Sequence, residues 1–143
     1  YNVTKGYFNN PEATKETIDT EGWLHTGDIG ILDHNGYIKI TDRSKDMFIV
    51  GGFNAYPAEI ENILCDHPSI SQAAVIGIAD ERMGEVAKAF VVLKPNHELQ
   101  EDTLVQWSKE NMANYKVPRE IVFVEALPTN AAGKVMKYIL KEG

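Results

Sequence analysis

Two β-prone segments joined by only five residues constrain most strongly how this chain can fold. The segments are "ISQAAVIGIAD" (70–80) and "VAKAFVVLK" (86–94), and "ERMGE" lies between them. Apolar runs of this length, bounded by polar residues, are typical of buried strands. A connection this short joins two strands of a hairpin rather than two parallel strands. The rest of the chain must therefore build on this strand pair.

The segments around this pair predict a mixed order of helices and strands. From about Asp46 onward the order is strand, helix, strand, strand, helix, strand, helix. This order predicts an α+β domain, in which helices pack on a small three-stranded sheet. The third sheet strand is expected in "REIVFVEAL" (119–127), and a short β-prone segment is expected at 47–50. The helices are expected from Pro57 to the "HPS" stretch at 67–69, at 101–112 and at 135–141.

The segment before Asp46 has a different character. Asn10 can cap a short helix that starts at Pro11. Further on, the Asn-Gly pair in "DHNG" (33–36) is a hairpin-turn signal. It lies between predicted strands at 28–32 and 37–41, so the sheet domain is preceded by a β-hairpin. The polar stretch "TDRSKD" (41–46) is the candidate boundary, and we expect a division into residues 1–44 and 45–143.

Composition excludes several classes of function. The chain has 143 residues and a net charge of −7, which argues against a nucleic-acid partner, because phosphate neutralisation supplies much of that affinity. No apolar run approaches the roughly 20 residues of a transmembrane helix. The single cysteine, Cys65, rules out an internal disulfide and fits a reducing compartment, the cytoplasm. The four histidines are far apart, so no metal site is expected in this chain.

Two charged residues near the predicted hairpin could bind a ligand. Asp28 ends "HTGD" at the start of a strand, where a carboxylate can accept hydrogen bonds from vicinal hydroxyls such as those of ribose. Arg43 offers a planar set of donors that suits phosphate or sugar oxygens. By local pattern alone, a turn-capping role for Asp28 and a surface salt bridge for Arg43 fit at least as well.

Glycine-containing turns supply the other candidates. Gly51 and Gly52 would let the backbone approach a ligand closely, although a plain turn explains them too. Lys134 follows a glycine in "LPTNAAGKVMK" (127–137). This is not a phosphate-binding P-loop, because Pro128 and Val135 stand where that signature requires a glycine and a Ser or Thr. A lysine on a short loop can still carry a point charge to a phosphate, or it can be an ordinary surface lysine.

Four motifs, taken together and in order, favour the functional interpretation of these residues over the ordinary structural one. "GWLHTGD", "DRSKDMFIVGGFNAYPAEIE", "AAVIGIADERMGE" and "YKVPREIVFVEALPTNAAGK" resemble the C-terminal part of the adenylate-forming acyl-CoA synthetase superfamily. The resemblance runs from about Gly6 to Leu140. "GGFNAYPAEIE" is most similar to medium- and long-chain fatty acyl-CoA ligases.

This resemblance implies an AMP-forming acid–thiol ligase. The full-length enzyme would use ATP and Mg²⁺ to turn a carboxylic acid into acyl-AMP, and would then transfer the acyl group to coenzyme A. Most substrate sites would lie in a large N-terminal domain, whose tail would be residues 1–44. Residues 45–143 would form a small mobile domain with one pose for each half-reaction. We therefore expect the chain to be part of a longer protein and to be inactive alone, with no tightly bound cofactor.

Roles in the first half-reaction are implied for three residues. Asp28 matches the family's ligand of the ribose hydroxyls of ATP and AMP, and Arg43 matches its partner near the ribose and phosphate. Lys134 matches the lysine that bridges the carboxylate and the α-phosphate during adenylation. One position departs from the family pattern, because Ala132 stands where a Thr or Ser often precedes the Gly-Lys pair.

Roles in the second half-reaction are implied for three more residues. Lys45 falls at the hinge position, which holds Asp or Lys in the family. Gly51 and Gly52 match the loop that lines the pantetheine tunnel. Two alternatives remain: an adenylation unit that loads an acyl carrier protein, and a noncatalytic interaction module of the same fold. The presence of Asp28, Arg43 and Lys134 argues against the second.

Overall fold

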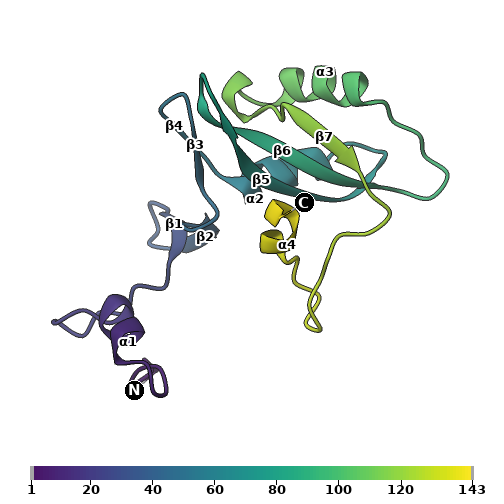
Figure 1. Cartoon of the computed structure of the whole chain (residues 1–143). Helices are drawn as coiled ribbons and strands as arrows, with labels where there is room; N and C mark the ends of the chain where they lie inside the picture. The colour runs from purple at the N-terminus through teal and green to yellow at the C-terminus, as the bar shows by residue number, and fades with distance from the viewer. Residues whose placement is uncertain (1, 143) are drawn as a thin grey trace.

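The computed structural model describes residues 2–142 (Figure 1). Residue 1 of the expected range 1–44 and residue 143 of the expected range 45–143 therefore lie outside the described residues. It is a mixed α+β structure. The elements are α1 (Pro11–Thr17), β1 (Asp28–Leu32), β2 (Ile38–Arg43), β3 (Phe48–Val50), β4 (Phe53–Ala55), α2 (Pro57–Cys65), β5 (Ile70–Asp80), β6 (Gly84–Leu93), α3 (Glu101–Asn111), a 3₁₀ turn η1 (Asn114–Lys116), β7 (Glu120–Phe123) and α4 (Lys137–Glu142).

The N-terminal segment has the predicted helix and hairpin. The Asn10 side chain accepts a hydrogen bond from the amide of Ala13 at 3.0 Å, so Asn10 caps α1 as expected. Strands β1 and β2 pair antiparallel. In the turn between them, the Asp33 carboxylate accepts from the amides of Asn35 and Tyr37, each at 2.8 Å. Local turn chemistry therefore specifies the turn of this hairpin.

The expectation of a three-stranded sheet is wrong, because the main sheet among the described residues has five strands. The three predicted strands correspond to β5, β6 and β7, with β5 antiparallel and β7 parallel to β6. The two additional strands, β3 and β4, form a small hairpin that joins the sheet through the pairing of Val50 with Gly84.

The missed strand β4 follows directly from the glycine pair at 51–52. Val50 pairs with Phe53, so the two glycines alone form the connection. Both have positive φ, 56° for Gly51 and 89° for Gly52. A two-residue hairpin turn of this kind requires positive φ at both central residues. The glycine pair therefore turns the chain back into a strand, where we expected it only to end one.

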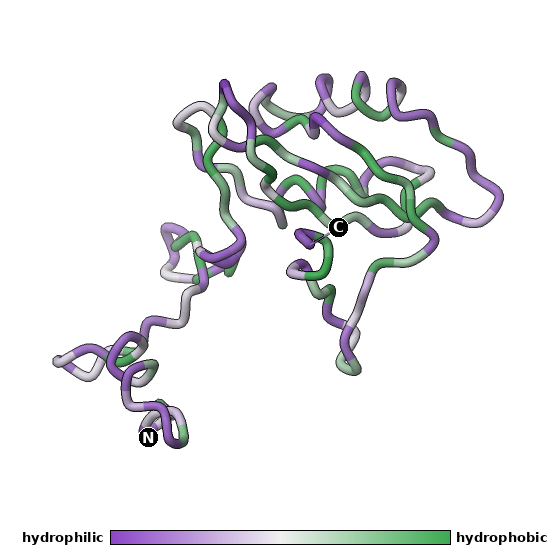
Figure 2. Tube along the Cα trace, viewed as in Figure 1, coloured by the Kyte–Doolittle hydropathy of each residue, from purple (hydrophilic) through white to green (hydrophobic). Residues whose placement is uncertain are grey.

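The core lies within the sheet domain. In Figure 1, α3 lies on one side of the five-stranded sheet, and α2 and α4 lie on the other. Hydrophobic segments concentrate along the central strands (Figure 2), because both faces of the sheet are covered. The largest buried apolar side chains include Ile60 and Leu64 of α2, Val75 of β5, Val91 of β6 and Leu104 of α3.

Residues 2–44 contain almost no core. Asp42 is the only buried residue among them. Five large apolar side chains of the hairpin are between 60% and 75% exposed, namely Ile31, Leu32, Tyr37, Ile38 and Ile40. Within residues 2–142, every helix is too short or too polar to cross a lipid bilayer.

Candidate functional site

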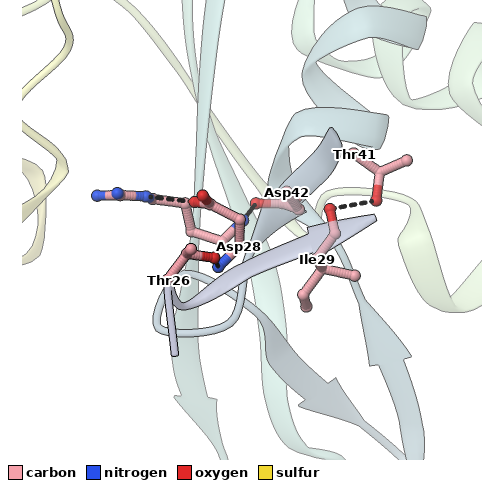
Figure 3. Close-up of polar contacts among 6 residues, drawn as sticks. Thr26, Asp28, Ile29, Thr41 and Asp42 are labelled. Carbon is pink, nitrogen blue, oxygen red and sulfur yellow. Dashed lines mark hydrogen bonds and ion pairs between the residues drawn. The ribbon is translucent and has the colours of Figure 1, made fainter. Parts of the chain in front are cut away.

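Asp28 and Arg43 are direct neighbours across the hairpin. They are cross-strand partners in the pairing of β1 with β2, and Arg43 Nε donates to Asp28 Oδ1 at 3.2 Å (Figure 3). The amide of Asp28 donates to Thr26 Oγ1 at 3.1 Å, which fixes the start of β1. The Arg43 side chain is 56% exposed. An exposed ion pair is worth only about 0–1 kcal/mol, so this one orients two polar groups and still leaves them accessible to a ligand.

Asp42, which sequence reasoning missed, connects the hairpin to the sheet domain. One carboxylate oxygen accepts from the amide of Arg43 at 2.7 Å, and the other accepts from the amide of Ala58 at 2.8 Å. Ala58 lies in the first turn of α2, where Tyr56 at the capping position makes no side-chain cap. Asp42 therefore caps α2 from another element, with its charge at the positive end of the helix dipole. Its neighbour Arg43 is thereby held in place.

We expect Asp42→Ala to lower the free energy of unfolding by about 1 kcal/mol, the usual cost of losing a helix N-cap. The reason is that the Ala58 amide would lose its acceptor. Urea unfolding of the variant, compared with wild type, measures this loss. Asp42→Asn keeps one acceptor oxygen and should lose less. Equal stability of Asp42→Ala and wild type would show that the contact contributes nothing.

Lys134 lies on a tight loop that closes on itself. Thr129 and Val135 form a β-bridge, and the Asn130 side chain accepts from the amides of Ala132 and Lys134 at 3.0 and 2.9 Å. The carbonyl of Lys134 accepts from the amide of Asn130 at 2.9 Å. Backbone atoms and Asn130 thus hold the loop, so a hydroxyl at Ala132 is not needed for its shape, and the exposed Lys134 side chain remains outside these contacts.

A cavity of about 540 Å³ lies between the end of β2 and the Lys134 loop. It brings together three of the predicted site residues, although the loop follows β2 by about 90 positions in the sequence. The lining includes Arg43, Lys45 and Lys134. Asp28 does not line the cavity itself, but its neighbour in sequence, Gly27, and its hydrogen-bond partner, Arg43, both do.

The cavity lining is strongly cationic for a chain with a net charge of −7. Four cations line it, and Asp46 is the one acid in the lining. Charges of one sign on the walls of a cleft reinforce one another and attract an oppositely charged ligand. The four cations are Arg43, Lys45, Lys134 and Lys137. Lys137 is paired with Glu61 at 2.7 Å, so Arg43, Lys45 and Lys134 are the cations that suit the cavity to an anion.

Gly51 and Gly52 lie elsewhere and do not line this cavity. The amide of Gly51 donates to the carbonyl of Met83 at 2.8 Å, and a Cβ at Gly51 would come within 2.5 Å of Met83 Cε. A Cβ at Gly52 would meet nothing within 4 Å. The glycine turn thus presents bare backbone at a site of its own.

Sequence reasoning also missed Asn130 and Lys137. An Asn four residues before Lys134, with a glycine between them, is a local signal for a side-chain-capped turn, and it could have been found. Lys137 had no such signal, because its position in the cavity depends on how α4 packs. In the part of the chain that the structure describes, no group of three His, Cys, Asp or Glu residues could hold a metal ion.

Two relatives of this chain are CoA ligases. It is 57% identical over 141 residues to 3-[(3aS,4S,7aS)-7a-methyl-1,5-dioxo-octahydro-1H-inden-4-yl]propanoyl:CoA ligase of Rhodococcus jostii, covering 99% of this chain and 27% of that protein. It is 48% identical over 140 residues to the long-chain-fatty-acid–CoA ligase FadD13 of Mycobacterium tuberculosis, covering 98% of this chain and 27% of FadD13. The chain thus spans little more than a quarter of the length of these relatives.

The crystal structure of ATP-bound MatB from Rhodopseudomonas palustris is similar over 99% of this chain and 28% of MatB, with a TM-score of 0.92 and 39% identity. Apo MatB, with the same coverage and 40% identity, has a TM-score of 0.71. A sequence model of a family described as "AMP-binding enzyme C-terminal domain" matches residues 59–134. This match covers more than half of the chain, which therefore belongs to the family of AMP-binding enzyme C-terminal domains.

Proposed function

We propose that this chain is the C-terminal region of an ATP-dependent, AMP-forming acyl-CoA ligase. The observation that carries the proposal is the cationic cavity between β2 and the Lys134 loop. Arg43, Lys45 and Lys134 in its lining suit a phosphate-bearing ligand, and the family is one of AMP-binding enzymes. Coenzyme A is the proposed acyl acceptor, because the relatives at 57% and 48% identity are CoA ligases.

In the proposed adenylation step, two anions must meet. The carboxylate of the acid attacks the α-phosphate of ATP and displaces pyrophosphate. The Lys134 ammonium would lie between the two anions and offset their repulsion, as a preorganised charge does at a transition state. Asp28 would accept hydrogen bonds from the ribose hydroxyls, and Arg43, oriented by Asp28 at 3.2 Å, would direct its remaining donors to the ribose and phosphate.

For the second step, we propose that residues 45–143 move as a unit relative to the tail of a larger domain in residues 1–44. Three observations support this division. The core consists of residues from β3 onward, five large apolar side chains of the hairpin are exposed, and two structures of MatB with the same coverage differ in their similarity to this chain. Lys45 would be the hinge, and the bare turn at Gly51 and Gly52 would line the pantetheine tunnel.

The proposed acid is a fatty acid or a similarly apolar carboxylic acid. The relatives' names include both a long-chain fatty acid and a fused-ring propanoic acid, so the family does not restrict the acyl group to one shape. Mg²⁺ as the companion of ATP, and a cytoplasmic location, remain predictions.

The direct test uses the full-length protein. Exchange of labelled pyrophosphate into ATP, dependent on an added carboxylic acid, measures adenylation. Loss of free thiol measures transfer to coenzyme A. Transfer to an acyl carrier protein instead would favour the loading unit, and absence of exchange with every acid would favour the noncatalytic module. We expect residues 1–143 alone to form no acyl-CoA, and formation by them would contradict the proposed division of sites.

We expect Lys45→Pro to slow thioester formation more than adenylation. Within residues 2–142 the amide of Lys45 donates no hydrogen bond, so the substitution removes none. Proline fixes φ near −65°, and strain of about 1–3 kcal/mol in a rotated state corresponds to roughly a tenfold to hundredfold slower second step.

The control for this prediction is Lys45→Ala, which removes the charge but leaves the backbone free to rotate. It should keep the thioester step fast if Lys45 acts as a hinge. The two steps are measured separately, by pyrophosphate exchange and by transfer from supplied acyl-AMP. Equal slowing of both steps by the proline would remove the hinge assignment.

A further inference from the structure

We propose that the ion pair between Glu61 of α2 and Lys137 of α4 is the anchor that orients the Lys134 loop for adenylation. The inference rests on the proposed function, since it assumes that Lys134 acts on the reacting groups. Glu61 and Lys137 are positioning residues here, because they act through the loop rather than on the substrate.

The contact itself is short and shielded. Lys137 Nζ lies 2.7 Å from Glu61 Oε1, and the two side chains are only 19% and 20% exposed. The same Glu61 oxygen also accepts from the backbone amide of Val75 in β5 at 2.8 Å. Glu61 is therefore fixed to the sheet as well as to α2, and it offers Lys137 a rigid partner. Shielding from water makes the Coulomb attraction within this pair greater than that within the exposed pair of Arg43 with Asp28.

Apolar packing does little to fix the segment that carries Lys134. Leu127 is the last buried residue before the loop, and none of residues 128–142 is buried. Helix α4 contains no buried residue. The loop is rigid internally, through the Thr129–Val135 bridge and the bond from the Met136 amide to the Pro128 carbonyl at 2.8 Å. A rigid loop of this kind turns as a body, so its direction depends on what holds its two ends.

The two ends are held in different ways. Leu127 fixes the entry by burial, and the pair of Lys137 with Glu61 fixes the exit, three residues after Lys134. Without the pair of Lys137 with Glu61, the loop could pivot about Leu127, and this motion would displace the Lys134 ammonium. A displacement of about 1 Å from reacting groups can cost a hundredfold in rate.

Helix α2 carries its own matched control. Lys116 Nζ lies 2.6 Å from Glu59 Oε1, with Lys116 16% exposed and Glu59 44% exposed. Burial lowers the pKa of Lys116, but the hydrogen bond and charge of Glu59 outweigh it, so the pKa is raised overall. Lys116 is therefore charged at neutral pH. Because residues two apart on a helix point to different sides, this second pair joins α2 to η1 and leaves the Lys134 loop untouched.

The experiment compares Glu61→Gln and Lys137→Met with Glu59→Gln and Lys116→Met in the full-length protein. For the first two variants we expect kcat for adenylation to fall about tenfold to a hundredfold. The KM for ATP and thioester formation from supplied acyl-AMP should change less than about twofold, because a misdirected Lys134 affects only the first transition state. Lys137→Arg should restore most of the rate, and the two control variants should keep it.

Hydrogen exchange of α4 separates this inference from the proposed function. Backbone amides of residues 137–142 should exchange faster in Glu61→Gln than in Glu59→Gln, whatever reaction the protein catalyses. If the α4 amides exchange faster in Glu61→Gln but the full-length protein shows no adenylation, the proposed function is wrong, while the role of the ion pair in holding α4 still stands. Wild-type adenylation in Glu61→Gln, or an equal loss in the control variants, would overturn the anchor. A loss in Lys137→Met alone would assign Lys137 to the substrate and would also overturn it.

Discussion

Replacing Lys134 with alanine should lower the rate of acyl-adenylate formation by about 10²–10³-fold, the effect of removing one preorganised charge donor at a transition state (about 3–4 kcal/mol). The physical reason is electrostatic. A carboxylate and the α-phosphate repel each other as they approach, and the ammonium offsets that repulsion only while both are present. Thioester formation from supplied acyl-AMP should continue, since the proposed second pose moves Lys134 away from the reacting atoms.

The loop geometry makes this a clean substitution. The backbone of Lys134 and the Asn130 side chain form the contacts that close the loop, so alanine keeps the loop and removes only the charge. Carboxylate-dependent pyrophosphate exchange measures the first step. Lys141→Ala, in the exposed last turn of α4, is the control and should retain full exchange. Unchanged exchange in Lys134→Ala would show that another group supplies the charge.

Replacing Asp28 with alanine should weaken the use of ATP by about a hundredfold, mainly as a higher KM. Hydrogen bonds to a charged group contribute about 1.5–3 kcal/mol each, and the two ribose hydroxyls would lose a common acceptor. The ribose is remote from the bond that forms, so its contacts stabilise ground state and transition state alike, and their loss raises KM with little change in kcat. Lys134→Ala should instead lower kcat and leave the KM for ATP nearly unchanged.

Arg43 complicates this prediction in a testable way. Asp28→Ala also frees the Arg43 guanidinium, which Asp28 now orients at 3.2 Å. Asp28→Asn keeps an acceptor for Arg43 Nε but weakens the contact to the hydroxyls, so an intermediate KM is expected. Lys39→Ala on the exposed part of β2 reports any general damage to the hairpin. A wild-type KM for ATP in Asp28→Ala would refute the ribose role.

Several elements could be predicted because their causes are local. Asn10 caps α1 and the Asp33 turn closes the β1–β2 hairpin through side-chain bonds over two to four residues, so neither depends on distant parts of the chain. The long strands β5 and β6 are set by continuous apolar runs. Strand β4 was missed because three residues after a glycine pair carry little periodicity, and only the pairing of Val50 with Phe53 reveals it.

The residues of the candidate site likewise fall into those that the sequence identified and those that only tertiary packing reveals. Motif order identified Asp28, Arg43, Lys45 and Lys134 as candidates, and it placed the chain in its family. It did not identify Asp42, because a buried aspartate that caps a helix 16 residues later has the same local pattern as an exposed one. Glu61 and Lys137 escaped notice for the same reason, since each is an ordinary charged helix residue until the packing of α4 brings them to 2.7 Å.

Most element types and the chemical character of the site residues could thus be predicted from the sequence, because propensity, turn chemistry and charge belong to short stretches of chain. Only the tertiary structure decided that residues of β2 and of the Lys134 loop line one cationic cavity of about 540 Å³ while Gly51 and Gly52 lie apart from it. That outcome depends on contacts between residues 16 to 90 positions apart, such as Asp42 with Ala58 and Glu61 with Lys137, and such contacts leave no periodicity in the sequence from which they could be read.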